Sequence, residues 1–186
     1  MTENLKVSHY NNGDPIPNFT NNTAWSTLKT GAYCDYDNTT GNSTTYGKLY
    51  NWYAVTDSRK LCPTGWHVPN SSEWWTTLIY YLGGSDIAGG KLKEVGTIHW
   101  KSPNTGATNE SGFTALPGGI SSGQDGEYSG AIFFVGDEGN WWTTSEVFEP
   151  SYGDIGGFIT LNYDDAATTI RYTGKSSGFS VRCVKD

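Results

Sequence analysis

The chain has 186 residues, of which 15% are aromatic, 17% are charged and 24 are glycine. This length suits one domain, residues 1–186, and the composition excludes a helical bundle, a coiled coil and an intrinsically disordered chain, which lacks aromatic groups to bury. The formal net charge is −7 and neither a basic cluster nor a long apolar run occurs, so we expect no nucleic-acid partner and no membrane insertion.

The composition of residues 1–45 predicts a segment without regular secondary structure. Clusters of Asn, Gly, Pro and Thr in this segment favour turns over regular hydrogen-bond ladders. Isolated apolar side chains punctuate it and are expected to pin it to a core. They are Tyr10, Ile16, Trp25, Leu28 and Tyr33.

Two helices are predicted in the first half of the chain. Residues 47–55 place apolar side chains at helical spacing. The second helix begins at Asn70, an N-cap residue followed three positions later by Glu73, which is a capping-box arrangement. Its expected apolar face consists of Trp74, Leu78, Tyr81 and Leu82. Two glycines at 83–84 are expected to end it, and a further helical turn is expected within residues 88–95.

After Trp100 the apolar period changes to two, which predicts short strands separated by Gly and Asp. The expected strands are residues 112–116, 131–135, 141–145, 157–163, 166–172 and 178–184. Asp164 and Asp165 lie between two alternating segments and predict a hairpin turn. Helices early and antiparallel strands late indicate an α+β fold.

The three cysteines, Cys34, Cys62 and Cys183, have no zinc-site spacing. Cys62 and Cys183 each lie in an apolar segment, so they are the expected disulfide pair. Such a bridge would stabilise the fold by constraining the unfolded chain. The alternative is that both are buried free thiols.

Six segments carry a family resemblance. They are YGKLYNWYAV (46–55), KLCPTGWHVPNSSEWWTTL (60–78), AGGKLKEVG (88–96), GATNESGFTALPGG (106–119), GNWWTTSE (139–146) and GFSVRCVKD (178–186). Together they resemble the Fibrobacter succinogenes major paralogous domain, and GWHVPNSSEW also resembles a signature of formylglycine-generating-enzyme-like domains. These resemblances imply a C-type-lectin-like fold, with two early helices, a twisted antiparallel sheet, adjoining chain ends and long loops that display a ligand face.

The resemblance also implies a variable binding face. Some domains of this kind are variable proteins of diversity-generating retroelements, and here Val147–Ser177 would be the variable segment. Polar and aromatic residues mix in it, and tyrosine offers a large contact area at low entropy cost. The expected ligand-binding residues are Phe148, Tyr152, Asp154, Tyr163, Asp164, Asp165 and Tyr172, with Tyr128 and Trp142 as additions. The framework that holds them is expected to be built on Trp52, Trp66, Trp74, Phe113 and Phe179.

The adjacent Trp141 and Trp142 also suggest stacking on a carbohydrate. Neighbouring residues of a strand face opposite sides, so one indole is expected in the core while the other could be exposed. The favoured alternative is that loops cover both.

We expect no enzymatic activity. Formylglycine-generating enzymes use two nearby cysteines close to the C-terminus, whereas Cys183 stands alone there. The three histidines, His9, His67 and His99, are scattered, and His67 is expected to be a hydrogen-bonded framework residue rather than a ligand. Ser111 has no nucleophile motif around it.

Calcium is the one cofactor that the sequence leaves open. Oxygen-bearing side chains lie on loops where lectin-like domains can hold this ion, which takes six to eight oxygen ligands. They are Asn104, Asn109, Glu110, Asp125, Asp137 and Glu138. No EF-hand spacing occurs, and Asn109 and Glu110 are expected to bond backbone amides of their own loop instead. We therefore predict no resident cofactor.

These features predict a non-catalytic domain that binds a protein or a glycan on another cell surface. The parent would be an extracellular or cell-surface bacterial protein, or a receptor-binding component of a phage virion. No signal peptide is recognisable, and the first residues are expected to belong to a shortened chain. The alternative is a structural or adhesive module of a secreted or lipid-anchored surface protein, whose variable face has no selected ligand.

Overall fold

The computed structural model describes residues 1–123, 130–151 and 153–186. The helical elements are α1 (Asn22–Trp25), η1 (Tyr36–Asn38), α2 (Thr40–Tyr46), α3 (Trp52–Val55), η2 (Glu73–Ile79) and α4 (Ser85–Leu92). The strands are β1 (Tyr33–Cys34), β2 (Leu49–Asn51), β3 (Trp66–His67), β4 (Gly118–Ser121), β5 (Ile132–Val135), β6 (Glu138–Glu149), β7 (Gly153–Asn162), β8 (Thr168–Gly174), β9 (Gly178–Phe179) and β10 (Val184–Lys185). The fold is therefore mixed helix and sheet, as predicted.

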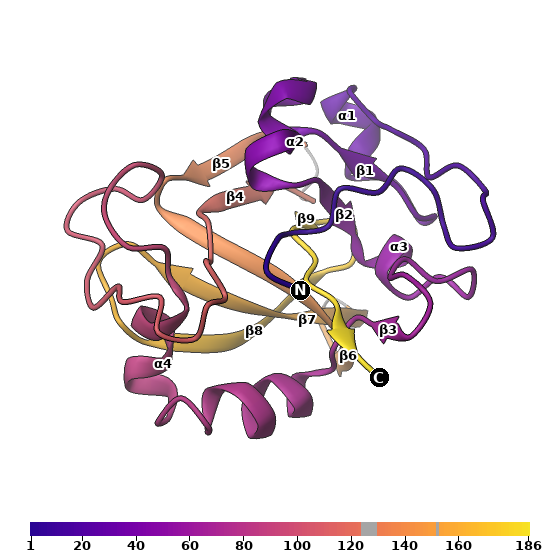
Figure 1. Cartoon of the computed structure of the whole chain (residues 1–186). Helices are drawn as coiled ribbons and strands as arrows, with labels where there is room; N and C mark the ends of the chain where they lie inside the picture. The colour runs from indigo at the N-terminus through magenta and orange to yellow at the C-terminus, as the bar shows by residue number, and fades with distance from the viewer. Residues whose placement is uncertain (124–129, 152) are drawn as a thin grey trace.

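The described strands form three sheets whose paired strands run antiparallel. One sheet has the order β1-β2-β9-β4-β5, another the order β6-β7-β8, and β10 pairs with β3. In Figure 1, β6, β7 and β8 cross the middle of the molecule, with α1, α2, β1 and β2 on one side and α4 on the other. The β7–β8 turn contains Asp164, so the predicted hairpin turn is confirmed.

Two tryptophans of β6 organise the packing on the two sides of this central sheet. Trp141 points into a core with Trp74 and Trp100, and Trp142 points into another with Tyr50 and Phe179. The two indoles are 1% and 0% exposed, which confirms that both are covered. Buried indoles need a hydrogen-bond acceptor, and the Trp142 Nε1 donates to the Tyr50 carbonyl oxygen at 2.7 Å. The prediction that Trp142 adds to a ligand face is therefore wrong.

The predicted helix at residues 47–55 forms only in its second half. Leu49 and Tyr50 belong to β2, which pairs with β1 on one side and β9 on the other. The helix α3 begins after Asn51, whose side chain accepts a hydrogen bond from the Ala54 amide at 3.0 Å. Tertiary strand pairing thus overrides the local helical spacing.

The helix predicted from Asn70 begins as expected and then widens. The Asn70 and Glu73 side chains each accept a hydrogen bond from the other's backbone amide, at 2.9 and 2.8 Å, so the capping box is confirmed. Residues 73–79 then form a π-helix, which carries more residues per turn than an α-helix. This widening buries Ile79 and leaves Tyr81 83% exposed, so the assignment of Tyr81 to the apolar face is wrong.

Two of the predicted strands differ in the structure. Residues 112–116 form a loop, in which Ala115 makes an isolated bridge with Lys93. Residues 178–184 divide into β9 and the start of β10, because Ser180 leaves the sheet of β9 and exchanges backbone hydrogen bonds with Asn140 and Trp142 of β6. The other predicted strands correspond to β5, β6, β7 and β8, and the predicted turn within residues 88–95 corresponds to α4.

The N-terminal segment is mostly irregular, as predicted. Its anchors Tyr10, Ile16, Trp25 and Tyr33 are at most 8% exposed, and Leu28 packs against a third cluster around Trp25. The helix α2 was not predicted, because its sequence TGNSTTY has no apolar stripe. Of the expected framework residues, Trp52, Trp74 and Phe179 are buried, while Trp66 and Phe113 are partly buried against the two cores.

A disulfide joins Cys62 to Cys183, with 6.0 Å between their Cα atoms, so the predicted pairing is confirmed. Cys34 is a buried free thiol, and burial raises its pKa to about 12. The bridge lies where the two chain ends meet. There the Met1 ammonium donates a hydrogen bond to the Cys183 carbonyl oxygen at 3.1 Å. Among the described residues, no helix is long and apolar enough to cross a membrane.

Candidate functional site

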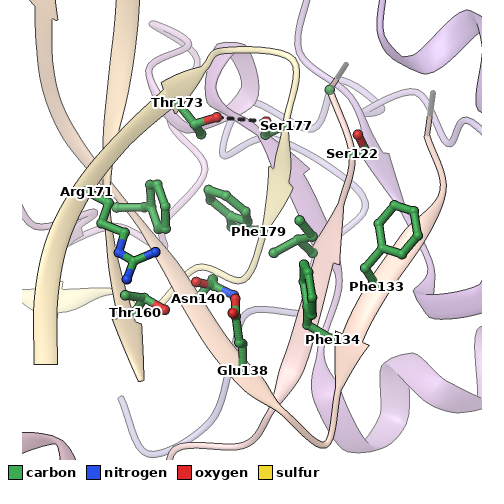
Figure 2. Close-up of a pocket in the computed structure, with 13 residues that line it drawn as sticks. Ser122, Phe133, Phe134, Glu138, Asn140, Thr160, Arg171, Thr173, Ser177 and Phe179 are labelled. Atoms are coloured by element: carbon green, nitrogen blue, oxygen red, sulfur yellow. Dashed lines mark hydrogen bonds between the residues drawn. The ribbon is translucent and has the colours of Figure 1, made fainter. Parts of the chain in front are cut away.

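A pocket of about 490 Å³ lies between one face of the β6–β7–β8 sheet and the strands β4, β5 and β9 (Figure 2). Strand alternation decides which side chains reach it. In β6 these are Glu138 and Asn140, in β7 Phe158 and Thr160, and in β8 Arg171 and Thr173. Asn140 lies directly opposite Thr160, and Phe158 directly opposite Arg171, so the floor is a compact patch of paired residues.

Phenylalanine rings form the apolar walls of the pocket. Phe158 and Phe179 pack in a tilted arrangement with their ring centroids 4.5 Å apart, and Phe133 and Phe134 line the side formed by β5. Phe134 is 47% exposed and has a φ of 64°, a left-handed conformation that bulky residues rarely adopt. This conformation leaves a large aromatic ring facing solvent at the pocket, and such backbone outliers concentrate at functional sites.

Polar side chains complete the lining. The Asn140 amide nitrogen donates to a Glu138 carboxylate oxygen at 3.3 Å, and the Thr173 and Ser177 hydroxyl oxygens lie 3.5 Å apart. Glu138 is the one carboxylate among the described residues of the lining. Arg171 of β8 and Thr160 of the neighbouring strand β7 both line the pocket (Figure 2). The Arg171 guanidinium forms no ion pair or hydrogen bond within the described ranges, so it is an unpaired positive charge in the pocket.

This composition suits a ligand with one flat apolar face and a hydrogen-bonding edge. Aromatic rings offer the apolar contact, and the hydroxyl, amide, carboxylate and guanidinium groups can fix its orientation.

The binding residues predicted from the sequence do not share one surface. Phe148 and Asp154 lie opposite each other near the tip of the β6–β7 hairpin, outside the pocket, and Phe148 is 72% exposed. Tyr163 and Tyr172 lie on the other face of the sheet, where Tyr163 packs against the Trp141 core. Asp164 and Asp165 are exposed in the β7–β8 turn. Tyr128 and Tyr152 lie outside the described residues.

The predicted variable segment nevertheless supplies part of the pocket. Its contribution consists of Phe158, Thr160, Arg171, Thr173 and Ser177. The period-two alternation that separates Phe158 and Arg171 from Ile159 and Ile170 could have identified the shared face. The contributions of β5 and of Glu138 and Asn140 come from outside the segment. Of these, the sequence indicates Glu138 alone, and as a calcium candidate rather than as part of a binding face.

The predicted calcium candidates are engaged separately. The Asn109 side chain bonds the backbone amide and the hydroxyl of Thr114, as predicted for a loop-organising residue. Glu110 pairs with Lys91 at 3.4 Å instead of bonding backbone amides, and Asp137 pairs with Lys101 at 2.6 Å. Asp125 lies outside the described residues. Within the described ranges, no group of three or more His, Cys, Asp or Glu is placed to hold a metal ion.

His67 is held between two carboxylates away from the pocket. Its Nδ1 lies 2.6 Å from an Asp186 oxygen and its Nε2 lies 2.8 Å from a Glu73 oxygen. These hydrogen bonds, to Asp186 first and then Glu73, raise the pKa of His67 above its ordinary 6.5. The residue thus joins β3, the start of η2 and the C-terminus, as expected for a framework histidine.

This arrangement predicts a pH-dependent contribution to stability. A raised pKa in the folded state stabilises the fold below about pH 6.5, and the contribution is lost as the pH rises through the folded-state pKa. Between pH 5.5 and 8 we expect the Tm of the wild type to fall more than that of His67→Gln, because Gln keeps hydrogen bonding without titrating. Parallel Tm profiles for the two proteins would contradict this assignment.

Comparison with protein families identifies a match that covers nearly the whole chain. The model of the Fibrobacter succinogenes major domain matches residues 1–185. No curated protein and no solved structure gives a significant match.

Proposed function

This chain belongs to the Fibrobacter succinogenes major domain family, and we propose for it a non-catalytic recognition function, the binding of a glycan on another cell surface. The observation that carries the proposal is the pocket on the β6–β7–β8 sheet, with phenylalanine walls and a polar floor. A pyranose ring has an apolar C–H face and a rim of hydroxyl groups, so it matches both parts of this lining. A flat protein surface would not need a concavity of this size.

The lining supports binding without turnover. Most glycoside hydrolases use two carboxyl groups on either side of the bond, and Glu138 is the single carboxylate of the described lining. Formylglycine-generating chemistry needs a pair of reactive cysteines. Here Cys183 is held in the disulfide with Cys62, and Cys34 is buried with a raised pKa.

A C-type-lectin-like fold and an extracellular location belong to the same proposal. The adjoining chain ends support the fold. The Cys62–Cys183 disulfide supports an oxidising compartment, because reducing compartments keep thiols free. If the protein is a retroelement variable protein, copies within one genome will differ mostly between Val147 and Ser177, and an even spread of differences would argue against it.

Replacing Phe134 by Ala tests the pocket directly. Loss of this exposed ring should weaken glycan binding about tenfold, equivalent to about 1.4 kcal/mol, while the fold is retained. The measurement is a glycan array to find binders, followed by calorimetric titration of a binder. Tyr80→Ala is the matched control, since Tyr80 is 78% exposed at the end of η2, beyond the opposite face of the sheet. Equal affinities for Phe134→Ala and the wild type would contradict the proposed site.

A structural or adhesive module is the second candidate. Its support is an exposed aromatic group on and after η2, in which Trp75, Tyr80 and Tyr81 are 44%, 78% and 83% exposed. Large exposed apolar side chains that gather on one surface mark protein contacts. This function would be favoured if no glycan bound and Tyr80→Ala, rather than Phe134→Ala, reduced adhesion of the parent protein.

A further inference from the structure

Among the described residues, Arg171 differs from the other two arginines of the chain in having no partner. Arg59 pairs with Asp14 and Asp57, at 3.2 and 2.8 Å. Arg182 is 3% exposed and donates to the Phe113 carbonyl oxygen and to the Asn4 side chain. In the part of the chain that the structure describes, Arg171 makes neither kind of contact, although the protein has a net charge of −7.

Arg171 lines the pocket from the strand position next to the apolar wall. It extends from β8 directly opposite Phe158, whose ring packs against that of Phe179. Glu138, the pocket's carboxylate, is hydrogen-bonded to Asn140, and no ion pair joins it to Arg171 in the described chain. The described lining of the pocket thus has one unpaired cation, Arg171, and one anion, Glu138, which is already hydrogen-bonded.

A planar guanidinium binds a carboxylate or a sulfate through two parallel hydrogen bonds, which adds both strength and directional specificity. In acidic sugars the charged group projects from the rim of the ring and leaves the C–H face free. A sugar resting against the Phe158 wall can therefore bring its charged group to Arg171 without losing the apolar contact.

We propose, building on the proposed function, that the ligand is an anionic glycan and that Arg171 determines this specificity by pairing with a carboxylate or sulfate on the sugar. Glu138 limits the affinity, because its carboxylate repels the same ligand. The neutral side chains Asn140, Thr160 and Thr173 contact the hydroxyl groups.

Calorimetric titration with tetragalacturonate, galactotetraose and a sulfated galactose tetramer tests the proposal on the full chain. We expect at least one acidic tetramer to bind about tenfold more tightly than the neutral one, with a preference that weakens as salt is added. Arg171→Gln should remove the preference. Arg171→Lys should retain part of it, since a lysine keeps the positive charge but lacks the paired N–H donors of a guanidinium. Glu138→Gln should change affinity in the opposite direction and tighten acidic binding. Arg59→Gln, which removes a surface arginine outside the pocket, should change nothing.

The outcomes separate the two proposals. Preferential binding of the carboxylated or the sulfated tetramer supports the inference and identifies the charged group. Equal binding of neutral and acidic tetramers, unchanged by Arg171→Gln, overturns the inference and leaves glycan recognition standing. Both proposals fail if no tetramer binds and a glycan array with matched neutral, carboxylated and sulfated glycans also shows no binding.

Discussion

Replacing both Cys62 and Cys183 by Ala should lower the free energy of unfolding by about 4 to 5 kcal/mol. The two residues are 121 positions apart, so the bridge constrains most of the chain in the unfolded state. Domains of this size are stable by only about 5 to 15 kcal/mol, which places the variant close to the limit of folding. Urea unfolding of the wild type and the variant, monitored by tryptophan fluorescence, measures the difference.

Cys34→Ala is the matched control for this experiment. Cys34 is as buried as the bridged cysteines, at 3% exposed, but closes no loop. Its replacement should cost about 1 kcal/mol, the typical effect of a single core truncation. Reduction of the wild type should reproduce most of the loss seen in the double variant. A double variant no less stable than Cys34→Ala would show that loop closure contributes nothing measurable.

Local signals in the sequence predicted those parts of the fold that depend on neighbouring residues. The capping box of Asn70 and Glu73 needs only residues three positions apart, and it forms as expected. The π-helix that follows packs Ile79 into a core built from distant strands, and no local pattern indicates it. The same reason explains β2, whose helical spacing yields to pairing with β1 and β9.

The sequence indicates a segment that supplies part of the candidate site, but it does not indicate the surface on which the site lies. The sequence indicates Tyr163 and Tyr172 as binding residues because they are tyrosines. Both lie on the sheet face opposite the pocket, where Tyr163 packs against the Trp141 core. Phe158 resembles a core residue in sequence, and it lines the pocket because β4, β5 and β9 leave a hollow above it. Which face of a sheet remains open depends on these long-range contacts, so alternation alone can group the residues but cannot choose the face.

Lys93 is the strongest departure from what its sequence context suggests. A lysine within GKLKEVG would ordinarily lie in solvent, but this residue is 0% exposed. Its ammonium donates to the carbonyl oxygens of Thr105, Asn162 and Asp165, at 2.9, 2.8 and 2.8 Å. Two separate segments, one at Thr105 and one at Asn162–Asp165, thus converge on one charge, which ties the end of α4 to the β7–β8 turn.

Burial lowers the pKa of Lys93 to about 8, against the opposing effect of the Asp165 and Asp164 carboxylates. At pH 7 the group therefore remains mostly protonated and can donate all three hydrogen bonds. Replacing it by Met keeps the length and apolar volume of the side chain but removes every donor. Carbonyl oxygens left unpaired in the interior each cost roughly 1 to 3 kcal/mol, and part of this is offset because a charge is no longer buried.

We therefore expect Lys93→Met to lower the free energy of unfolding at pH 7 by about 3 kcal/mol. Urea unfolding measures the change, and Lys91→Met is the control. Lys91 lies two positions earlier, and its contact with Glu110 is a surface pair worth at most about 1 kcal/mol. A Lys93→Met protein as stable as Lys91→Met would mean that the cost of burying the ammonium equals the value of its three hydrogen bonds. In that case the convergence of the three carbonyls on Lys93 would specify the geometry of the turn without stabilising the fold.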